Sequence, residues 1–158
     1  MSMFLCSGIT QETVDAADAF PRVFGRFQAW LGDHDEDDSV FLTLGDWDFK
    51  TMLPDQCRLS GVTLPPRFRQ WVNVKRSFQT CQGYFPRSMR SMLDDLNIPL
   101  VGRHHSGIDD VNNIVSIVQT LALSEKGYVY DVTGRLKDNP SELDNPCTKA
   151  AVVSKQDN

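Results

Sequence analysis

The sequence predicts an α/β fold, and three observations lead to that prediction. The apolar run Val40–Leu44 has the length and composition of a buried strand. Apolar residues recur at spacings of three and four between Val111 and Leu121, which is the period of one helical face. A chain of 158 residues with 41% hydrophobic content is long enough to form one core. We expect one domain over residues 1–135 and a polar, proline-bearing, disordered segment over 136–158.

The remaining elements follow from local patterns. Helical spacing over Phe20–Leu31 predicts an amphipathic core helix, with Pro21 in its first turn, where a missing N–H costs nothing. Its apolar positions are Phe20, Val23, Phe24, Phe27, Trp30 and Leu31. A second helix is predicted over Ser88–Leu96, with Ser88 as its N-cap. The alternation at Tyr128–Val132 predicts a short strand closed by a turn at Thr133–Gly134.

Charge is distributed unevenly along the chain. The net charge is −5, yet residues 58–103 carry 8 basic and 2 acidic side chains. The basic residues alternate with aromatic ones: Arg58, Arg67, Arg69, Lys75, Arg76, Arg87, Arg90 and Arg103 with Phe68, Trp71, Phe78, Tyr84 and Phe85. Such a mixture can hold phosphates and stack bases. The alternative is that the aromatic residues near Trp71 belong to a strand and the arginines form its solvated rim.

The sequence also predicts where the protein works. No apolar run approaches ~18 residues and no charged-then-apolar leader opens the chain, so neither a membrane span nor a secretion signal is expected. The four cysteines are Cys6, Cys57, Cys81 and Cys147, and no two of them form a C-x-x-C pair. We therefore expect no zinc site, reduced thiols, and a cytoplasmic or nuclear location.

The densest group of chemistry-bearing side chains precedes the predicted helix that reaches Leu121. There, His105 is followed closely by two carboxylates, Asp109 and Asp110. Asp109 is a suitable N-cap, which places Asp110 in the first turn and His105 on the approach loop. A base and a carboxylate would then share one helix N-terminus. The alternative is that both carboxylates only cap the helix and complement its dipole.

A second acidic group, Gly45–Asp48, directly follows the predicted strand Val40–Leu44. An Asp at the carboxyl end of a strand in an open α/β sheet lies where ligands bind, and the neighbouring Trp47 offers a flat apolar face. We therefore expect the two acidic loops to face one crevice.

With both groups in view, the chain resembles the DEDDh 3′ to 5′ exonucleases, and among them the Eri-type enzymes that include the histone-mRNA 3′ exonuclease. The resemblance rests chiefly on GDWDFKTMLP at 45–54 and GRHHSGIDD at 102–110, and it extends over most of the chain. It implies a ribonuclease H-like fold with a mixed sheet flanked by helices. It also implies hydrolysis of RNA 3′ ends, single-stranded or within structured RNA, to 5′ mononucleotides.

The resemblance further implies roles for individual residues. Asp48 and Asp110 would be ligands of two Mg²⁺ or Mn²⁺ ions, which oxygen donors suit. His105 would take the proton from the attacking water. Substrate contacts would come from Trp47 and Phe49 on the terminal base, with core packing as the alternative for Phe49, and from two arginines. These arginines are Arg76 and Arg103.

One departure from the family pattern concerns its first motif, Asp-x-Glu, which is absent from these 158 residues. The resemblance implies that the first three strands of the fold are missing as well, which leaves Val40–Leu44 as an edge able to associate with another chain. Three explanations are open: a fragment or incomplete gene model, a divergent inactive copy, or a partner that completes the sheet. The chain alone is expected to be nearly inactive. The alternative function is an inactive RNA-binding or interaction module.

Overall fold

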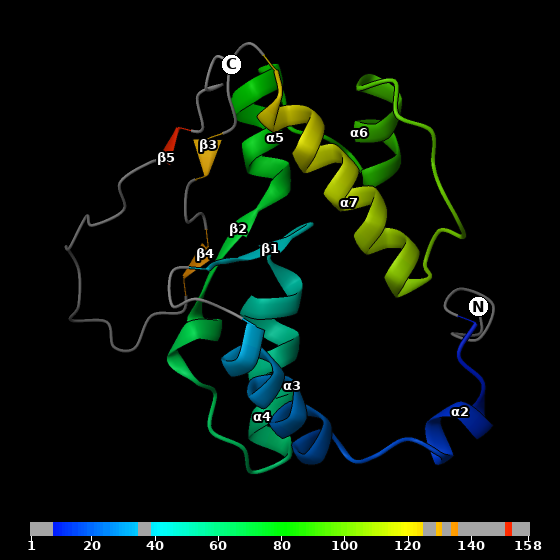
Figure 1. Ribbon diagram of the computed structural model, residues 1–158, viewed down its shortest axis with the longest axis vertical. Coiled ribbons are helices and arrows are strands. Elements are labelled where there is room, and N and C mark those ends of the chain that lie inside the picture. Colours follow the sequence, from blue (N-terminus) through cyan, green and yellow to red (C-terminus); the bar gives the residue numbers. More distant parts are fainter. Residues whose placement is uncertain (1–7, 35–38, 125–128, 131–133, 136–150, 153–158) are drawn as a thin grey trace. The chain divides into compact units, whose positions relative to one another are not determined.

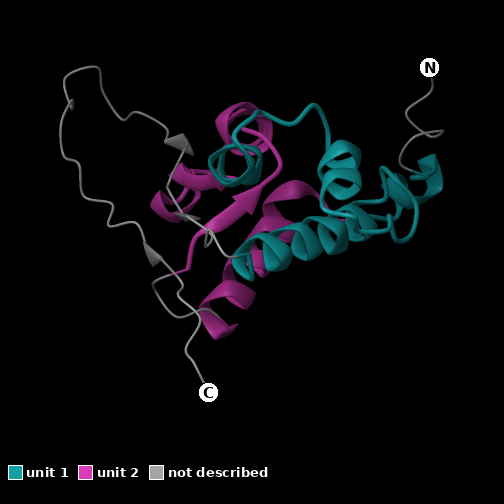
Figure 2. Cartoon of the chain, turned by 90° about the horizontal axis from the view of Figure 1, so that it is seen from above, with its two compact units in different colours: residues 1–17, 74–130, 150–158 teal, residues 18–73, 131–149 magenta. Residues whose placement is uncertain are grey.

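The computed structural model describes residues 8–34, 39–124, 129–130, 134–135 and 151–152. The chain forms two compact units (Figure 2). The strand unit comprises Asp18–Asn73 and Asp131–Lys149, and the helical unit comprises Met1–Ala17, Val74–Tyr130 and Ala150–Asn158. The predicted domain bounds 1–135 and 136–158 stay a prediction. No helix among the described ranges is long and apolar enough to span a membrane.

The strand unit is built on a small mixed sheet (Figure 1). Strand β1 (Phe41–Thr43) runs parallel to β2 (Gln70–Asn73), with Phe41 opposite Trp71 and Thr43 opposite Asn73. Strand β4 (Gly134–Arg135) pairs antiparallel with the other edge of β2. The helical elements are α3 (Phe20–His34), the π-helix η1 (Asp48–Met52), α4 (Leu53–Leu59) and the 3₁₀ helix η2 (Pro66–Arg69). The predicted α/β character and mixed sheet are confirmed.

Aromatic side chains form the core of the strand unit. Phe24 and Leu31 of α3 are buried together with Cys57 and Phe68. Phe41 of β1 stacks on the Phe68 ring at 5.0 Å. Residues from all the main elements of the unit therefore meet in one cluster.

Burial in β1 and α3 is less complete than predicted. In the predicted buried strand, Val40 and Leu42 are 38% and 39% exposed. Side chains alternate along a strand, so Leu42 lies on the face opposite to the Phe41 cluster. On α3, Val23, Phe27 and Trp30 are exposed, because the apolar stripe is wider than the core surface it meets. Phe27 and His34 both stack with Trp30, at centroid distances of 6.2 Å and 4.9 Å, and Phe27 also lies 6.1 Å from the buried Phe68 ring.

The helical unit packs its main helices around a second core. These helices are α5 (Val74–Gln82), α6 (Met89–Asp95) and α7 (Gly107–Ala122), whereas α2 (Gln11–Asp15) of the same unit has no buried residue. Its most deeply buried side chains are Val74, Phe78, Met92, Leu93, Ile117 and Leu121, and Cys81 is buried with them. Cys81 and Cys57, in the other unit, both remain thiols. Among the described residues, each unit therefore contains one buried thiol.

The structure confirms one predicted element of this unit and corrects others. The helix predicted over Ser88–Leu96 is α6, where Ser88 and Ser91 form a reciprocal capping box. In α7 the predicted apolar face is partly wrong, since Val111 and Val115 are 53% and 45% exposed. The buried side chains of α7 are Asn113, Ile117, Val118 and Leu121, so a polar residue replaces an apolar one near the start of the buried face.

The C-terminal predictions are described only in part. Strand β3 is Val129–Tyr130, within the predicted strand. The predicted closing residue Gly134 lies in β4 instead. Ala151–Val152, inside the segment expected to be disordered, forms β5 and pairs antiparallel with β3. The rest of 136–158 lies outside the described residues.

Candidate active site

The corner after β1 is held by hydrogen bonds to the neighbouring strand. The Asp46 carboxylate accepts hydrogen bonds from Trp71 Nε1 at 2.9 Å and from Asn73 Nδ2 at 3.1 Å. Trp71 and Asn73 are 1% and 3% exposed, so the Asp46 carboxylate satisfies two buried donors. Gly45 has φ +140°, a conformation open to glycine, which lets the chain turn sharply out of the strand. Asp46 thus fixes the corner.

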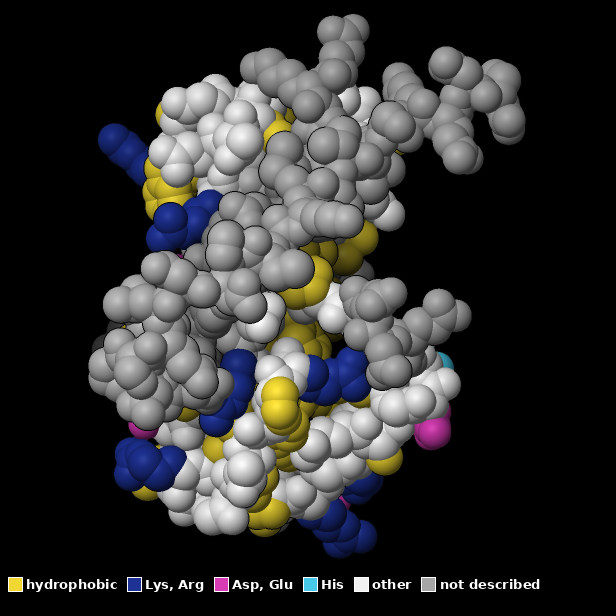
Figure 3. All heavy atoms as spheres, turned by 90° about the vertical axis from the view of Figure 1, so that its left-hand side faces the viewer, with side chains coloured by type: hydrophobic (Ala, Val, Ile, Leu, Met, Phe, Trp, Pro, Cys, Tyr) yellow, Lys and Arg dark blue, Asp and Glu magenta, His cyan; other side chains and the backbone are white. Residues whose placement is uncertain are grey.

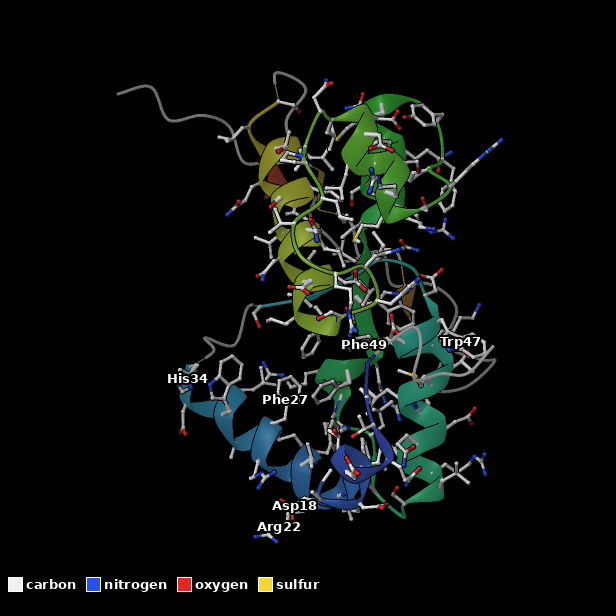
Figure 4. The ribbon with its side chains drawn as sticks, turned by 90° about the vertical axis from the view of Figure 1, so that its right-hand side faces the viewer. Asp18, Arg22, Phe27, His34, Trp47 and Phe49 are labelled. Carbon is white, nitrogen blue, oxygen red and sulfur yellow. The ribbon has the colours of Figure 1, made fainter. Side chains whose placement is uncertain are left out.

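Trp47, Asp48 and Phe49 follow this corner with different surroundings, and Figure 4 shows Trp47 and Phe49. Trp47 is 67% exposed, and the exposed Asp48 begins η1. Phe49 packs against Phe41 at 5.0 Å and Trp71 at 5.9 Å, so core packing is its structural role. π-helical turns are rare and frequently occur at functional sites. The corner therefore presents a carboxylate and an aromatic face to solvent from a rigid base.

A buried asparagine and a carboxylate hold the loop that leads into α7. Asn113 Oδ1 accepts from Val101 N at 3.0 Å, and its Nδ2 lies 2.8 Å from Val101 O. The Asp109 carboxylate accepts from Arg103 N at 3.0 Å. Gly102 has φ +75°, and a Cβ there would lie 2.3 Å from Asp109 Cγ, so only glycine fits beside this carboxylate.

The N-terminus of α7 differs by a few residues from the prediction. The helix begins at Gly107, and Ser106, not Asp109, is its N-cap. Asp109 lies in the first turn and folds back onto the loop. The amide N–H of Arg103, followed by the Ser106 hydroxyl, holds the pKa of Asp109 below its usual value. The charge of Asp109 is therefore used to hold the loop, which leaves Asp110 as the other carboxylate of the motif.

His105 and Asp110 are brought together at this helix N-terminus. His105 has φ +71°, which is uncommon for a residue other than glycine, and its backbone N donates to Asp110 Oδ1 at 3.3 Å. The exposed imidazole stacks on the ring of His104 at 4.0 Å. Strained backbone of this kind clusters at functional sites. The predicted pairing of His105 with Asp110 at one helix end is therefore present in the structure.

The two predicted arginines both belong to the helical unit. Arg103 follows Gly102 in the loop, and its guanidinium lies against Gly8, where a Cβ would be 2.2 Å from Nη2. Arg76 is exposed on α5. Their substrate contacts stay predictions.

The site residues fall into two groups. Trp47, Asp48 and Phe49 lie in the strand unit, whereas Arg76, Arg103, His105 and Asp110 lie in the helical unit. That the two acidic loops face one crevice stays a prediction. Sequence analysis missed Asp46 and Asn113 as positioning residues. Asp46 stands within the quoted GDWDFKTMLP motif, whereas no local pattern distinguishes Asn113 from its neighbour Asn112.

The carboxylates of Asp48 and Asp110 are the candidate metal ligands of this site. Over the described ranges, no three His, Cys, Asp or Glu side chains gather closely enough to hold an ion. The carboxylate oxygens of Asp48 and Asp110 have the chemistry that Mg²⁺ and Mn²⁺ prefer. Asp48 is exposed and so accessible to an ion. Each of these two side chains has the donor chemistry to supply part of the ligand set of a hard cation.

Comparisons with known proteins identify the family. A family model described as exonuclease, RNase T, matches residues 3–118. The chain belongs to this exonuclease family. Within it, the chain is similar to the nuclease domain of 3′hExo, a DEDDh family member solved bound to rAMP. The TM-score is 0.76 at 31% identity, over 84% of this chain and 68% of that one.

Curated relatives of this exonuclease-family chain point the same way. An exonuclease domain-containing protein of Arabidopsis thaliana is 39% identical over 137 residues, covering 81% of this chain and 40% of the relative. ERI1 exoribonuclease 3 of Homo sapiens is 36% identical over 134 residues, covering 82% and 39%. The chain thus spans about 40% of the length of these relatives. It is an Eri-type DEDDh exonuclease homologue with a ribonuclease H-like fold.

Proposed function

We propose that the chain supplies Asp48, His105 and Asp110 to a 3′ to 5′ exoribonuclease site that releases 5′ mononucleotides from RNA. The observation that carries the proposal is the hydrogen bond from His105 N to Asp110 Oδ1 at the start of α7, in a chain of the exonuclease family. One relative is named an exoribonuclease, and the solved homologue is bound to rAMP. Both support RNA as the substrate class.

The proposed chemistry divides between the two acidic groups. Asp48 and Asp110 would hold divalent ions, Mg²⁺ or Mn²⁺, and such ions bound as a pair stabilise the attacking and leaving oxygens of an in-line displacement. The His105 imidazole takes the proton from the attacking water on a ring nitrogen. The exposed Trp47 ring provides a face for the terminal base, and the cations of Arg76 and Arg103 attract the phosphates.

The test removes one proposed ligand at a time. In the protein that carries this chain, Asp48→Ala or Asp110→Ala should lower Mg²⁺-dependent release of 5′ mononucleotides from single-stranded RNA by at least about 100-fold. RNA affinity in EDTA should persist. The matched control is Asp55→Ala, which removes an exposed carboxylate on α4 that only pairs with Arg58 at 3.4 Å. Release within a few-fold of wild type in either ligand variant would refute the assignment.

The role of His105 is tested against its neighbour. His105→Ala should slow release by roughly 100-fold or more and remove the acid-side inflection of the pH–rate profile. His104→Ala removes the stacked ring and should change the rate little. Mn²⁺ binding should survive in both variants. A pH–rate profile that keeps its inflection in His105→Ala would exclude this residue as the base.

A second candidate function is an RNA-binding or interaction module without catalysis, favoured by the lack of Asp-x-Glu in these 158 residues. The chain supplies two of the four carboxylates implied by the resemblance, so by itself it should hold two cations weakly and release nucleotides slowly or not at all. RNA binding without Mg²⁺-dependent release by the wild-type protein would favour the module. Fast, EDTA-sensitive release by the isolated chain would show that the first motif is dispensable.

A further inference from the structure

The segment from α5 to the start of α6 combines positive charge with exposed aromatic rings. Residues 74–90 contain four basic side chains, Lys75, Arg76, Arg87 and Arg90, and no acidic one. All of these residues belong to the helical unit. Basic side chains border hydrophobic ones on the surface of this protein, as at the upper left of Figure 3.

The structure separates the aromatic residues of this segment by their packing. Phe78 is fully buried, whereas Tyr84 and Phe85 are 46% and 51% exposed. The Tyr84 hydroxyl hydrogen-bonds to the Asp95 carboxylate, and its ring meets Phe78 edge-on at 5.7 Å. Both rings are therefore partly exposed, and Tyr84 is in addition held by contacts with Asp95 and Phe78.

The backbone on both sides of Phe85 is anchored, although the Phe85 ring is exposed. Tyr84 is anchored on one side, and on the other side Pro86 is fully buried. Lys75 Nζ donates to Arg87 O at 3.1 Å, which ties the connection between the helices back to α5. A single exposed aromatic is common at protein surfaces. An aromatic residue whose backbone is anchored on both sides has less conformational entropy to lose when a ligand packs on its ring.

The cation beside Phe85 indicates what kind of ligand fits. Lys75 Nζ lies 5.9 Å from the Phe85 ring centroid, within cation–π range. An aromatic face next to positive charge is the arrangement that single-stranded nucleic acid uses, with bases stacked on rings and phosphates held by Lys and Arg. An acidic protein partner would complement the cations but not the ring, and an apolar one would complement the ring but not the cations.

We propose that Phe85, together with Lys75 and Arg87, forms a binding site for single-stranded RNA in which one base stacks on the ring and neighbouring phosphates meet the two cations. The site deepens the exoribonuclease proposal and rests on it for the choice of RNA. It uses none of Asp48, His105 and Asp110, so it contributes to substrate affinity and not to the chemical step.

The test measures RNA affinity without cleavage. With the 158-residue chain in EDTA and a fluorescent 12-nucleotide single-stranded RNA, Phe85→Ala should weaken binding about tenfold, as expected for one lost base stack. Phe85→Tyr should retain binding. Leu123→Ala is the matched control, because Leu123 is a 68% exposed apolar residue of the same unit. Arg87→Gln should lower the slope of log K against log salt by about 0.7.

The outcomes separate this inference from the proposed function. Unchanged affinity in Phe85→Ala, with wild-type RNA binding intact and folding confirmed by circular dichroism, would overturn the inference and leave the exonuclease proposal standing. Weakened binding in Phe85→Ala would support the inference whether or not Mg²⁺-dependent release is seen, because the binding assay in EDTA does not depend on the exonuclease proposal. Equal weakening in Leu123→Ala would also overturn the inference, since it would show no preference for the aromatic ring.

Discussion

Asp109 is the side chain whose charge contributes most clearly to the loop that presents His105. Its carboxylate receives the Arg103 N–H, and its pKa lies below the usual value because of that hydrogen bond and the Ser106 hydroxyl. A carboxyl with a lowered pKa in the folded state stabilises the fold above its ordinary pKa near ~3.9, and that stabilisation is lost as pH falls through the lowered value.

We expect Asp109→Asn to lower the free energy of unfolding at pH 7. Asparagine cannot carry the charge that the Arg103 N–H and the Ser106 hydroxyl stabilise. The difference between wild type and variant should shrink as pH falls through the lowered pKa of Asp109, because the wild-type carboxyl then becomes protonated as well. Urea denaturation at pH 7, 4 and 2.5 measures this. A difference that is constant with pH would contradict a role for the charge.

Sequence reasoning predicts individual residues well only where their partners are near in the chain. His105 and Asp110 are five positions apart, so a loop followed by a helix was enough to place them together. The partners of Asp46, Trp71 and Asn73, are 25 and 27 positions away. No local pattern reports such a pairing, because it depends on the parallel register of two strands. For this reason the hydrogen bonds from Trp71 and Asn73 to Asp46, which hold the corner before Asp48, are known only from the structure.

The turn from β1 into η1 depends on a neighbouring strand for its shape. Asn73→Ala should remove one donor to Asp46 and leave a partly buried carboxylate with fewer hydrogen bonds. We expect a loss of about 1–3 kcal/mol in the free energy of unfolding. Asn112→Ala, at an exposed position of α7, is the control and should cost much less. Equal urea midpoints for the two variants would show that the hydrogen bond from Asn73 to Asp46 contributes nothing to stability.

Strand β1 offers one edge of its sheet for association. Over the described part of the chain it pairs with β2 only, and Leu42 is 39% exposed. Unpaired strand edges with apolar side chains favour pairing with another chain, and an edge lysine opposes it. Leu42→Lys should therefore reduce concentration-dependent self-association in analytical ultracentrifugation. Leu59→Lys, at a 72% exposed position of α4, should not. Identical sedimentation of wild type and Leu42→Lys would argue against the edge as an interface.

The elements themselves were easier to predict than the faces that they bury. The capping residue Ser88 and the strand at residues 41–43 follow from local chemistry. Which side of α7 is buried depends on α5 and α6, so Val111 was misassigned to the core and Asn113 was overlooked. Periodicity gives the stripe of a helix, whereas its orientation is set by what packs against it.

Over the whole molecule, the division into two units was not predictable from composition. Each unit combines segments that are far apart in the chain, with Met1–Ala17 joined to Val74–Tyr130 and Asp18–Asn73 joined to Asp131–Lys149. No shift in composition or proline-rich linker marks the change at Asn73 and Val74, where a strand passes directly into a helix. The family motifs, in contrast, identified the fold because they preserve residue types at fixed positions on it.

The buried thiols give this architecture a built-in pair of reporters. Cys57 lies in the core of the strand unit and Cys81 in that of the helical unit, at 2% and 3% exposure. Burial also raises the pKa of Cys57, which makes its thiol still less reactive in the native state. With Cys6 and Cys147 replaced by serine, each remaining thiol reacts with an alkylating reagent only when its own unit opens. The two labelling rates, read by peptide mass spectrometry in one sample, then reveal whether the units open as a single cooperative body or one before the other.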